Sequence, residues 1–297
     1  MQEFIVTNEI DRIDNYLSKK TELSRSKIAK MIKEGKILVN DELTKASYNI
    51  KENDIIKVEE YVEDAMNLEP INMNLDIVYE DDDVIVVNKD NGVVVHPAPG
   101  NYTNTLVNGL LYHSKELSNI NGEFRPGIVH RIDAYTTGLL MVAKNNKAHE
   151  ILAKELEEKK TKRKYIALVW GIINTDTGTI DAPIGRDIKD RKKMAVTDVN
   201  SKDAVTHFKV LERYASTTLI ELELETGRTH QIRVHMNYIG YPVVNDPVYG
   251  KRKLIDNTGQ CLHAKTLGFV HPSTGKYLEF DSELPLCFTN ILNQFKD

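Results

Sequence analysis

The stretch from Arg125 to Gly138 concentrates side chains that could do acid–base or nucleophilic chemistry. It contains His130, Arg131 and Asp133, and it leads into the apolar run 139–143. A cation-rich, glycine-bracketed loop that enters a buried strand places Asp133 at the rim of a core, where neighbouring groups can fix its orientation. That position suits a catalytic carboxylate. Taken alone, an Asp in such a loop is more often a turn cap or a structural ion-pair partner.

A second polar stretch runs from Thr226 to His235 and contains Arg228 and Arg233. Thr229 is the predicted N-cap of a short helix, and that helix would carry Arg233 toward the interior.

Two basic runs accompany these stretches. Tyr165 follows the run 161–164, and 187–193 holds four further cations, Lys189, Arg191, Lys192 and Lys193. From the residues alone, Tyr165 is best interpreted as an ordinary strand aromatic.

The standard nucleotide- and metal-binding signatures do not occur in the sequence. The patterns GxGxxG after a strand, GxxxxGK[ST] and HExxH are absent, which argues against dinucleotide and Walker-type phosphate sites. His230 and His235 are five residues apart, so a helix would turn them to different sides. We therefore interpret the nine histidines as core, surface or hydrogen-bonding groups, and predict no metal site.

The elements that must position these side chains are mainly strands. Strand-like runs cover residues 77–79, 84–87, 139–142, 165–169 and 217–224. One helix is predicted from Asn146 to Lys159, where Ile151, Leu152 and Leu156 are apolar. The strands cluster without strict alternation with helices, which favours an α+β fold with a mixed sheet over a doubly wound fold.

A basic block occupies residues 12–36, with eight basic against three acidic side chains. Ser24 is predicted to cap a helix in which apolar residues recur at i, i+3 and i+4 from Ile28, and Gly35 stands where a left-handed helix end is expected. Strand-like runs follow at 37–39 and 55–58. The candidate RNA contacts of this block are Arg25, Lys27, Lys30 and Lys33. The pattern predicts a small phosphate-binding module, and the alternative is a solvated helix face.

The chain has 297 residues, a length that predicts about two domains. Its net charge of −5 argues, as an average, against a nucleic-acid partner. The charge is divided, however, because residues 51–83 hold twelve acidic side chains against two lysines. We predict a small N-terminal α/β domain over 1–60, an acidic linker over 61–74 and a larger domain over 75–297.

Cys261 and Cys287 are the two cysteines of the sequence, which excludes a disulfide framework, a zinc ribbon and a CxxC pair. The N-terminal residues show no basic region followed by an apolar stretch, and no apolar run of 18 residues occurs. We therefore expect a cytoplasmic protein with no membrane partner.

Several segments resemble, in the same order, the RluA family of pseudouridine synthases. They are Asn88-Lys89 with Gly92, His96-Pro97, 125–143, Lys164-Tyr165 with Gly171, 226–235, 245–250, 262–264, and Phe269 with His271-Pro272. The head resembles the S4-type RNA-binding domain in the segments 12–17, 23–28, 35–40 and 54–56. The similarity spans nearly all of 75–285, and the combined architecture is similar to the large-subunit ribosomal RNA pseudouridine synthase D type.

The resemblance implies isomerisation of uridine to pseudouridine in structured RNA, in particular large-subunit (23S) ribosomal RNA. The uracil is detached from C1′ of the ribose, rotated and rejoined through C5, so no cofactor is expected. It also implies a mainly antiparallel catalytic sheet with flanking helices. RNA is the expected partner, and the protein is expected to be a monomer.

The resemblance also implies roles for individual residues. Asp133 matches the essential Asp, acting as nucleophile at C1′ or as the base that removes the C2′ proton. Arg233 matches the arginine that pairs with that Asp, and Tyr165 matches a tyrosine that stacks on the base. Arg131 matches the residue that fills the space left by the flipped uridine. The remaining RNA-contact candidates near the site are His130, Thr137 and Arg228.

This sequence departs from the family pattern at two places. Ile132 replaces a common Leu, which is a near-isosteric change, whereas Ala134-Tyr135 replaces a common Lys-Asp and exchanges two charges for a stacking surface. Three other functions remain open at this point. They are the same chemistry on other ribosomal or transfer RNA uridines, a non-catalytic RNA-binding or ribosome-assembly factor, and a metal-dependent hydrolase built on His130 and Asp133.

Overall fold

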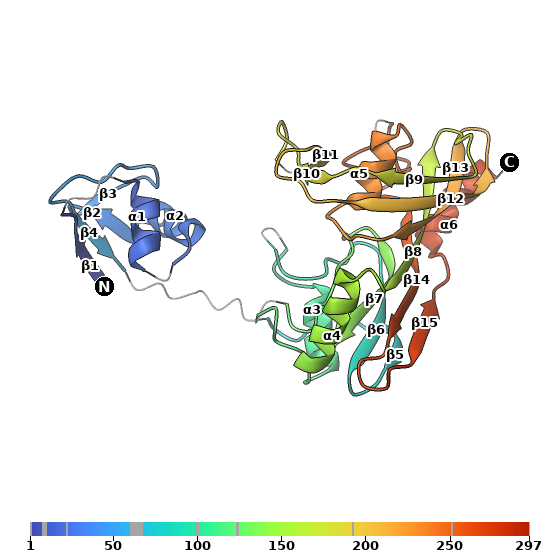
Figure 1. The fold of residues 1–297 in the computed structure, drawn as a ribbon, viewed down its shortest axis with the longest axis horizontal. Coiled ribbons are helices and arrows are strands. Elements are labelled where there is room, and N and C mark those ends of the chain that lie inside the picture. The colour runs from blue at the N-terminus through green and yellow to red at the C-terminus, as the bar shows by residue number, and fades with distance from the viewer. Residues whose placement is uncertain are drawn as a thin grey trace. The chain divides into compact units, whose positions relative to one another are not determined.

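A computed structural model describes residues 2–7, 11–21, 23–59, 68–98, 101–122, 125–191, 193–250 and 252–296. The chain divides into two compact units, Met1–Met66 and Asn67–Asp297, drawn in Figure 1. Lys192 and residues 61–67 of the predicted linker lie outside the described residues. None of the helices in the described part of the chain is long and apolar enough to cross a lipid bilayer.

The first unit packs two helices against a small antiparallel sheet. Its elements are β1 (Gln2–Ile5), α1 (Ile13–Lys20), α2 (Arg25–Lys33), β2 (Ile37–Val39), β3 (Glu42–Leu43) and β4 (Ile55–Val58). The strand order is β1-β4-β2-β3. Apolar residues of both helices and of the sheet form one core, which includes Ile13, Leu17, Ile28, Met31, Ile37 and Ile56.

The basic helix of this unit is confirmed, with both of its predicted end signals. The Ser24 side chain accepts a hydrogen bond from the Lys27 backbone N–H, and Gly35 has φ +74° just after the helix. Asp14 of α1 is 5% exposed and pairs with two arginines, Arg12 at 3.0 Å and Arg25 at 2.9 Å. Arg25 therefore holds the two helices together as well as presenting a cation.

The second unit is built on a mixed sheet that has nine strands over the described residues. In chain order these are β5 (Asp76–Glu80), β6 (Val84–Lys89), β7 (Thr137–Ala143), β8 (Lys162–Trp170), β9 (Thr177–Asp181), β12 (Val205–Arg213), β13 (Thr217–Leu224), β14 (Leu262–Val270) and β15 (Tyr277–Asp281). The spatial order is β5-β6-β7-β14-β8-β13-β12-β9, and β15 also pairs with β14. The pairing of β7 with β14 is parallel and the other named pairs are antiparallel. The predicted α+β class and mixed, mainly antiparallel sheet are confirmed.

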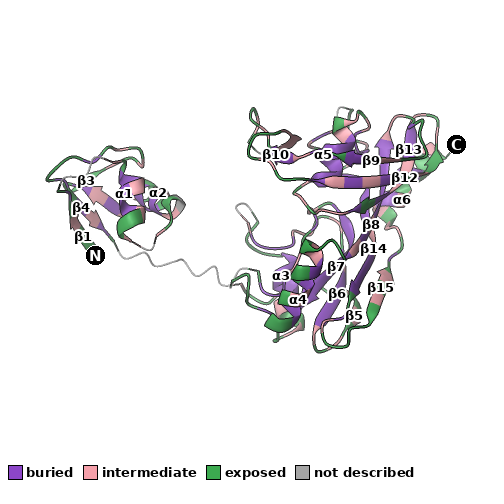
Figure 2. Cartoon of the chain, viewed as in Figure 1, coloured by how far each residue is buried: buried purple, intermediate pink, exposed green. Residues whose placement is uncertain are grey.

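Helices cover both faces of this sheet. They are α3 (Leu106–His113), α4 (Asn146–Glu157), α5 (Gln231–Tyr238) and α6 (Leu286–Leu292), followed by the 3-10 turn η1 (Asn293–Phe295). Alternate residues of β6 divide between two cores, because Ile85 and Val87 pack with α3 whereas Val84 and Val86 pack with α4. Figure 2 shows the resulting buried strands between partly exposed helices.

The two units are joined by residues that partly pack on the second unit. The backbone N–H of Ile71 donates to the Asn108 carbonyl oxygen, and the Asn108 amide donates to the carbonyl of Glu69. Leu68 and Leu75 pack against the core of the second unit. A separate hairpin, β10 (Ile184–Arg186) with β11 (Met194–Val196), lies next to α5 (Figure 1).

Candidate active site

A cavity of about 550 Å³ brings the two polar stretches of the sequence together. Its walls come from the loop before β7, from β8 and from the segment between β13 and α5. The charged residues that line it are Arg125, Arg131, Arg163, Arg228 and Arg233, against Asp133 and Glu157. Cations outnumber carboxylates, so this cavity of a net acidic chain attracts anions.

Asp133 is held in place because its loop is fixed from several sides. The Asp133 carbonyl accepts a hydrogen bond from the Thr136 backbone N–H at 3.0 Å, which closes a turn. The Thr136 hydroxyl accepts one from Gln260 at 3.1 Å. Immediately after this turn, Gly138 has φ +107°, and a Cβ there would lie 2.2 Å from the Ala264 carbonyl oxygen. Only glycine allows β7 to approach β14 this closely, and that approach places the Asp133 loop over the sheet.

Arg233 of α5 joins two carboxylates from distant parts of the chain. Its Nη1 donates to Asp133 Oδ2 at 2.8 Å, while Nε and Nη2 form a two-pronged pair with Asp246 at 2.7 and 2.8 Å. Asp246 is 1% exposed and also accepts from the backbone N–H groups of Val248 and Tyr249. Burial alone would lower the pKa of Arg233, but the two carboxylates outweigh it and raise that pKa. One oxygen of Asp133 is therefore anchored on a permanent cation.

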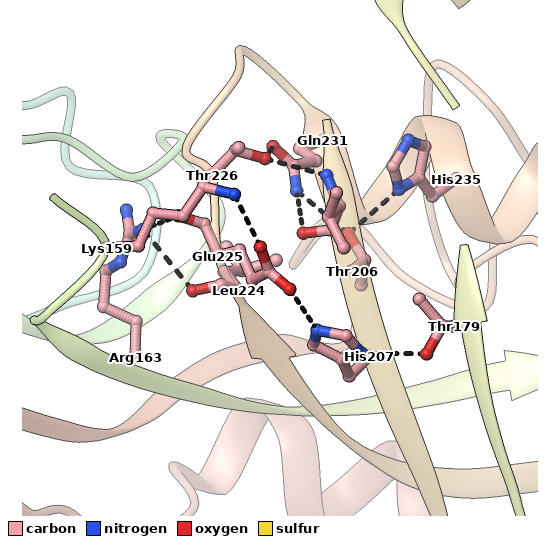
Figure 3. Close-up of polar contacts among 11 residues, drawn as sticks. Lys159, Arg163, Thr179, Thr206, His207, Leu224, Glu225, Thr226, Gln231 and His235 are labelled. Atoms are coloured by element: carbon pink, nitrogen blue, oxygen red, sulfur yellow. Dashed lines mark hydrogen bonds and ion pairs between the residues drawn. The ribbon is translucent and has the colours of Figure 1, made fainter. Parts of the chain in front are cut away.

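Side-chain hydrogen bonds fix α5 on both sides of Arg233 (Figure 3). Gln231 accepts from the Thr226 hydroxyl and donates to the Thr206 hydroxyl, at 2.8 and 3.0 Å. The Thr206 hydroxyl also contacts His235 Nδ1 at 2.9 Å, and His235 Nε2 contacts the Ala182 carbonyl oxygen at 2.9 Å. This chain of bonds sets the rotation of the helix, and with it the direction of Arg233.

The predicted N-cap of this helix is wrong, although the inward direction of Arg233 is confirmed. The residue in the N-cap position is His230, not Thr229, and it has φ +57° and no side-chain capping bond. The Gln231 side chain bonds instead to the segment before the helix, because its carbonyl oxygen accepts the Arg228 backbone N–H at 2.9 Å. A left-handed histidine turns the chain sharply where a capping threonine would extend it.

The left-handed turn brings His230 close to the Asp133 loop. Its Nε2 lies 3.8 Å from Asp133 Oδ1, and its Nδ1 lies 2.9 Å from the Tyr249 hydroxyl. That hydroxyl accepts a hydrogen bond from the Met194 backbone N–H on the β10–β11 hairpin. Burial lowers the pKa of His230, which favours its neutral form. The contacts of Tyr249 and Asp246 were not identified from the sequence, because the segment 245–250 was named only as part of the family resemblance.

Tyr165 lines the same cavity as Asp133, a position that the interpretation as an ordinary strand aromatic did not include. It lies on β8 and is 7% exposed. Burial raises the pKa of Tyr165, and the Asp133 charge acts in the same direction while Arg163 opposes it. The ring is therefore a neutral phenol at pH 7, which suits stacking on a flat base.

The other RNA-contact candidates near the site differ in whether they line the cavity. Arg131 and Arg228 line the cavity, and Arg228 Nε donates to the Asp203 carbonyl at 2.8 Å. His130 also lines the cavity, but its Nε2 accepts the Met141 backbone N–H at 3.1 Å. Thr137, by contrast, is not among the residues that line this cavity. Its side chain is buried on β7, where every residue is buried, and its hydroxyl contacts His263 Nδ1 at 2.8 Å.

The cations of α2 belong to the first unit, whereas the residues that line the cavity all belong to the second unit. Lys30 and Lys33 are exposed and Lys27 is half-buried. Lys30 lies 3.7 Å from Glu34, and the Arg25 side chain is 56% exposed despite its pair with Asp14. These side chains are accessible to a phosphate backbone.

The described residues contain no cluster of three or more His, Cys, Asp or Glu side chains that could hold a metal ion. His130 Nε2 is occupied by a backbone N–H, and Asp133 is occupied on one oxygen by Arg233. These two side chains are therefore poorly arranged to share a metal ion.

The buried Lys89 makes folding depend on pH above neutrality. Lys89 Nζ donates to the carbonyl oxygens of Asp90 and Ala134, and burial lowers its pKa to about 7. In the unfolded chain a lysine pKa is about 10.4, so between these values the unfolded state holds the extra proton. The free energy of unfolding therefore rises with pH from 7 to 10, by about 1 kcal/mol per pH unit.

We expect Lys89→Met to remove this rise, as measured by urea denaturation at pH 7, 8 and 9. The control is Lys276→Met, because the Lys276 side chain is exposed. Parallel stability curves for the wild type and Lys89→Met would contradict the prediction.

The comparisons with known proteins agree with this site. Residues 83–238 match the family model for RNA pseudouridylate synthase, and residues 11–56 match the S4 domain. An uncharacterized RNA pseudouridine synthase of Bacillus subtilis, YlyB, is 56% identical over 96% of this chain and 94% of its own length. The ribosomal large subunit pseudouridine synthase D of Neisseria meningitidis serogroup A is 46% identical over 92% of this chain and 76% of its own length.

A solved structure supports the same assignment. Human RNA pseudouridylate synthase domain containing 1 superposes with a TM-score of 0.59 at 30% identity, over 71% of this chain and 83% of its own. The matched family segment begins one residue before β6 and ends with α5, so it contains Asp133, Tyr165 and Arg233. This chain therefore belongs to the RNA pseudouridine synthases, the isomerases that convert uridine to pseudouridine in RNA, and it carries an S4 RNA-binding domain at its N-terminal end.

Proposed function

We propose that this enzyme isomerises specific uridines of large-subunit (23S) ribosomal RNA, with Asp133 as the reacting carboxylate and Tyr165 and Arg233 beside it. One observation carries the assignment of the site. Asp133 is anchored through Oδ2 on Arg233, and it lines an arginine-rich cavity that Tyr165 also lines. The ribosomal substrate is supported by the similarity to proteins named ribosomal large subunit pseudouridine synthase D.

The arrangement suits a reaction in which a base leaves and returns. The C1′–N1 bond of uridine breaks, the uracil rotates, and a C1′–C5 bond forms, after which C5 loses a proton and N1 gains one. Asp133 can assist by attacking C1′ or by removing the C2′ proton, and both roles need the ionised carboxylate that Arg233 stabilises. Tyr165 holds the detached ring by stacking, which keeps it in the cavity while it turns.

A uridine inside a folded RNA reaches this cavity only after it leaves its stack, at a cost of a few kcal/mol. Arg131 is exposed and lines the cavity beside the Asp133 loop. It is placed to enter the space that the flipped nucleotide leaves. We assign recognition of the flanking RNA to Arg131, Arg228 and the cavity edge at His130.

The direct test is to map pseudouridines in ribosomal and transfer RNA from cells with and without the gene. Loss of specific sites in the large-subunit RNA supports the proposal, and restoration by the wild-type gene but not by an Asp133→Asn gene assigns them to this site. Loss confined to transfer RNA would move the substrate to that class. An unchanged map in both RNAs would leave a binding factor and overturn the proposal.

We infer a division of labour along the chain, with RNA capture by residues 1–60, a linker over 61–74 and isomerisation by 75–297. The protein works as a monomer in the cytoplasm, where ribosomal RNA is made and folded. The RNA supplies the large partner surface, so a second protein chain is not required.

The lysines of α2 provide the test of RNA capture in the full-length protein. Replacing Lys27, Lys30 and Lys33 by Gln is expected to weaken RNA binding and to reduce the slope of log K against log salt by about 2, since each phosphate contact contributes about 0.7 to 0.9. The measurement is a salt titration of RNA affinity with a large-subunit RNA transcript. A control with the same charge change replaces Lys45, Lys51 and Lys57, which lie outside α2. Equal slopes for the two triple variants would show that α2 is not the contact.

A further inference from the structure

One buried cation of the active-site cavity has no ion-pair partner among the described residues of the chain. Arg163 on β8 is 7% exposed and lines the cavity. Its Nη2 makes two long hydrogen bonds, 3.3 Å to the Glu225 carbonyl oxygen and 3.5 Å to that of Leu224 (Figure 3). Its Nε is buried and has no hydrogen-bond partner within the described residues. Its environment thus differs from that of Arg233, which contacts two carboxylates.

An unpaired charge in the interior of a protein is unfavourable, and buried cations are normally paired with an anion. The carboxylate of Glu225, whose backbone carbonyl contacts Arg163, is occupied elsewhere. It pairs with Lys159 at 2.6 Å and contacts His207 at 2.8 Å (Figure 3). Arg163 is therefore left with carbonyl dipoles on one side and the cavity on the other.

The chain makes room for this guanidinium at Gly227. A Cβ on Gly227 would lie 2.7 Å from Arg163 Nη1. Gly227 is not among the residues with positive φ, so its backbone does not itself demand glycine. The missing side chain spares Nη1 this close contact, and Gly227 and Arg163 both line the cavity.

Arg163 also lies on the same side of β8 as Tyr165, because alternate residues of a strand face the same way. Arg163 and Tyr165 are both buried. Lys162, before them, and Lys164, between them, are partly exposed and pair with Glu279 and Glu221, respectively. The strand thus presents one unpaired cation and the stacking ring to one cavity.

From this geometry we infer that Arg163 binds a backbone phosphate of the RNA next to the uridine that is isomerised, an inference that rests on the proposed function. Phosphate is the anion that every nucleotide of the substrate carries, and a guanidinium can donate two parallel hydrogen bonds to it. Uracil is neutral and would leave the buried charge unbalanced. With the base on Tyr165 and the phosphate on Arg163, the ribose between them is held against Asp133.

The test compares Arg163→Gln with Lys162→Gln in the full-length protein. The two variants remove the same charge one residue apart, but the Lys162 side chain pairs with Glu279 on the other side of the strand. With a large-subunit ribosomal RNA transcript, we expect Arg163→Gln to raise KM about tenfold with little change in kcat. The slope of log kcat/KM against log salt should fall by about 0.7 to 0.9. Lys162→Gln should leave KM, kcat and this slope near their wild-type values.

A second variant keeps every charge and guards against a folding defect. Gly227→Ala crowds Nη1 without removing the cation, so KM should rise here as well. A fall in kcat for Arg163→Gln at unchanged KM and salt slope would show that Arg163 only positions Tyr165, and would overturn the inference. An unchanged KM in Gly227→Ala, when Arg163→Gln does not fold, would overturn it too. A wild-type protein that forms no pseudouridine in any RNA would instead overturn the proposed function.

Discussion

Replacing Asp133 by Asn is expected to lower the rate of pseudouridine formation to less than about one thousandth of the wild-type rate. The amide can neither attack C1′ nor accept a proton from C2′, whichever of these roles the carboxylate has. The amide oxygen can still accept the hydrogen bond from Arg233, so the loop keeps its place. RNA affinity should be retained, since the substitution removes a negative charge from a site that binds an anionic polymer.

The measurement is single-turnover conversion of a large-subunit RNA transcript, followed by chromatography of the nucleosides, together with RNA binding by filter retention. Asp198→Asn is a matched control because Asp198 is exposed. Turnover of Asp133→Asn near the wild-type rate would remove Asp133 from the chemistry. A parallel loss of binding and turnover would show that the carboxylate serves the fold.

Arg233→Met should have the second large effect, because it removes the cation from two carboxylates at once. Breaking a buried ion pair on one side costs about 3 to 5 kcal/mol. We expect the free energy of unfolding to fall by about 3 kcal/mol at pH 7, and turnover to fall with it as Asp133 loses its anchor. Arg213→Met is the control, since the Arg213 pair with Asp176 lies on the surface. Its cost should be below about 1 kcal/mol.

The loss of stability in Arg233→Met should depend on pH in a way that identifies the Asp246 carboxylate as its source. In the wild type, burial would raise the pKa of Asp246, but the hydrogen bonds and charge of Arg233 outweigh it and lower that pKa, so the carboxyl stays ionised. In Arg233→Met the burial remains and the cation is gone, so the folded state takes up a proton more readily than the unfolded state. Stability of the variant then falls as pH rises, and its deficit relative to the wild type should be smaller at pH 5 than at pH 8.

The double variant Arg233→Met with Asp246→Leu should recover part of the lost stability, because it leaves no unpaired buried charge. Denaturant titrations of the wild type and the three variants at both pH values provide the measurement. A deficit that is equal at pH 5 and pH 8 would mean that lost packing, and not the charge of Asp246, causes the instability.

Local signals in the sequence predicted local structure well. The cap at Ser24 and the glycine at 35 each act within a few residues, and α2 begins and ends where they indicate. The strand run 217–224 corresponds to β13. The class of the fold also followed from the order of strands and helices, because connectivity restricts which layers can form. Grouping Asp133, Tyr165 and Arg233 needed the family resemblance, since more than 30 residues separate each from the next.

The positions of Thr229 and Thr137 differ from what their residue types suggest, for physical reasons that a single sequence hides. Thr229 has the type of a capping residue, but His230 turns left-handed and takes the N-cap position, and the Gln231 side chain accepts the Arg228 backbone N–H just before the helix. Thr137 lies on β7, which is buried on both faces, so the polar-apolar alternation that would tell inside from outside is absent. Asp246 and Tyr249 were missed because their partners, Arg233 and Met194, are distant in sequence.

The position of β14 in the sheet has a consequence for how the enzyme is made. This strand lies between β7 and β8 and joins the two halves of the sheet, yet it occupies residues 262–270. A ribosome synthesises the chain from the N-terminal end, so the halves β5-β6-β7 and β8-β13-β12-β9 emerge before the strand that unites them. Until then, β7 has no neighbour on the side of Gly138, and the Asp133 loop has no sheet edge to rest on. The two halves of the sheet can therefore be united, and the Asp133 loop supported, only after residues 262–270 have been made.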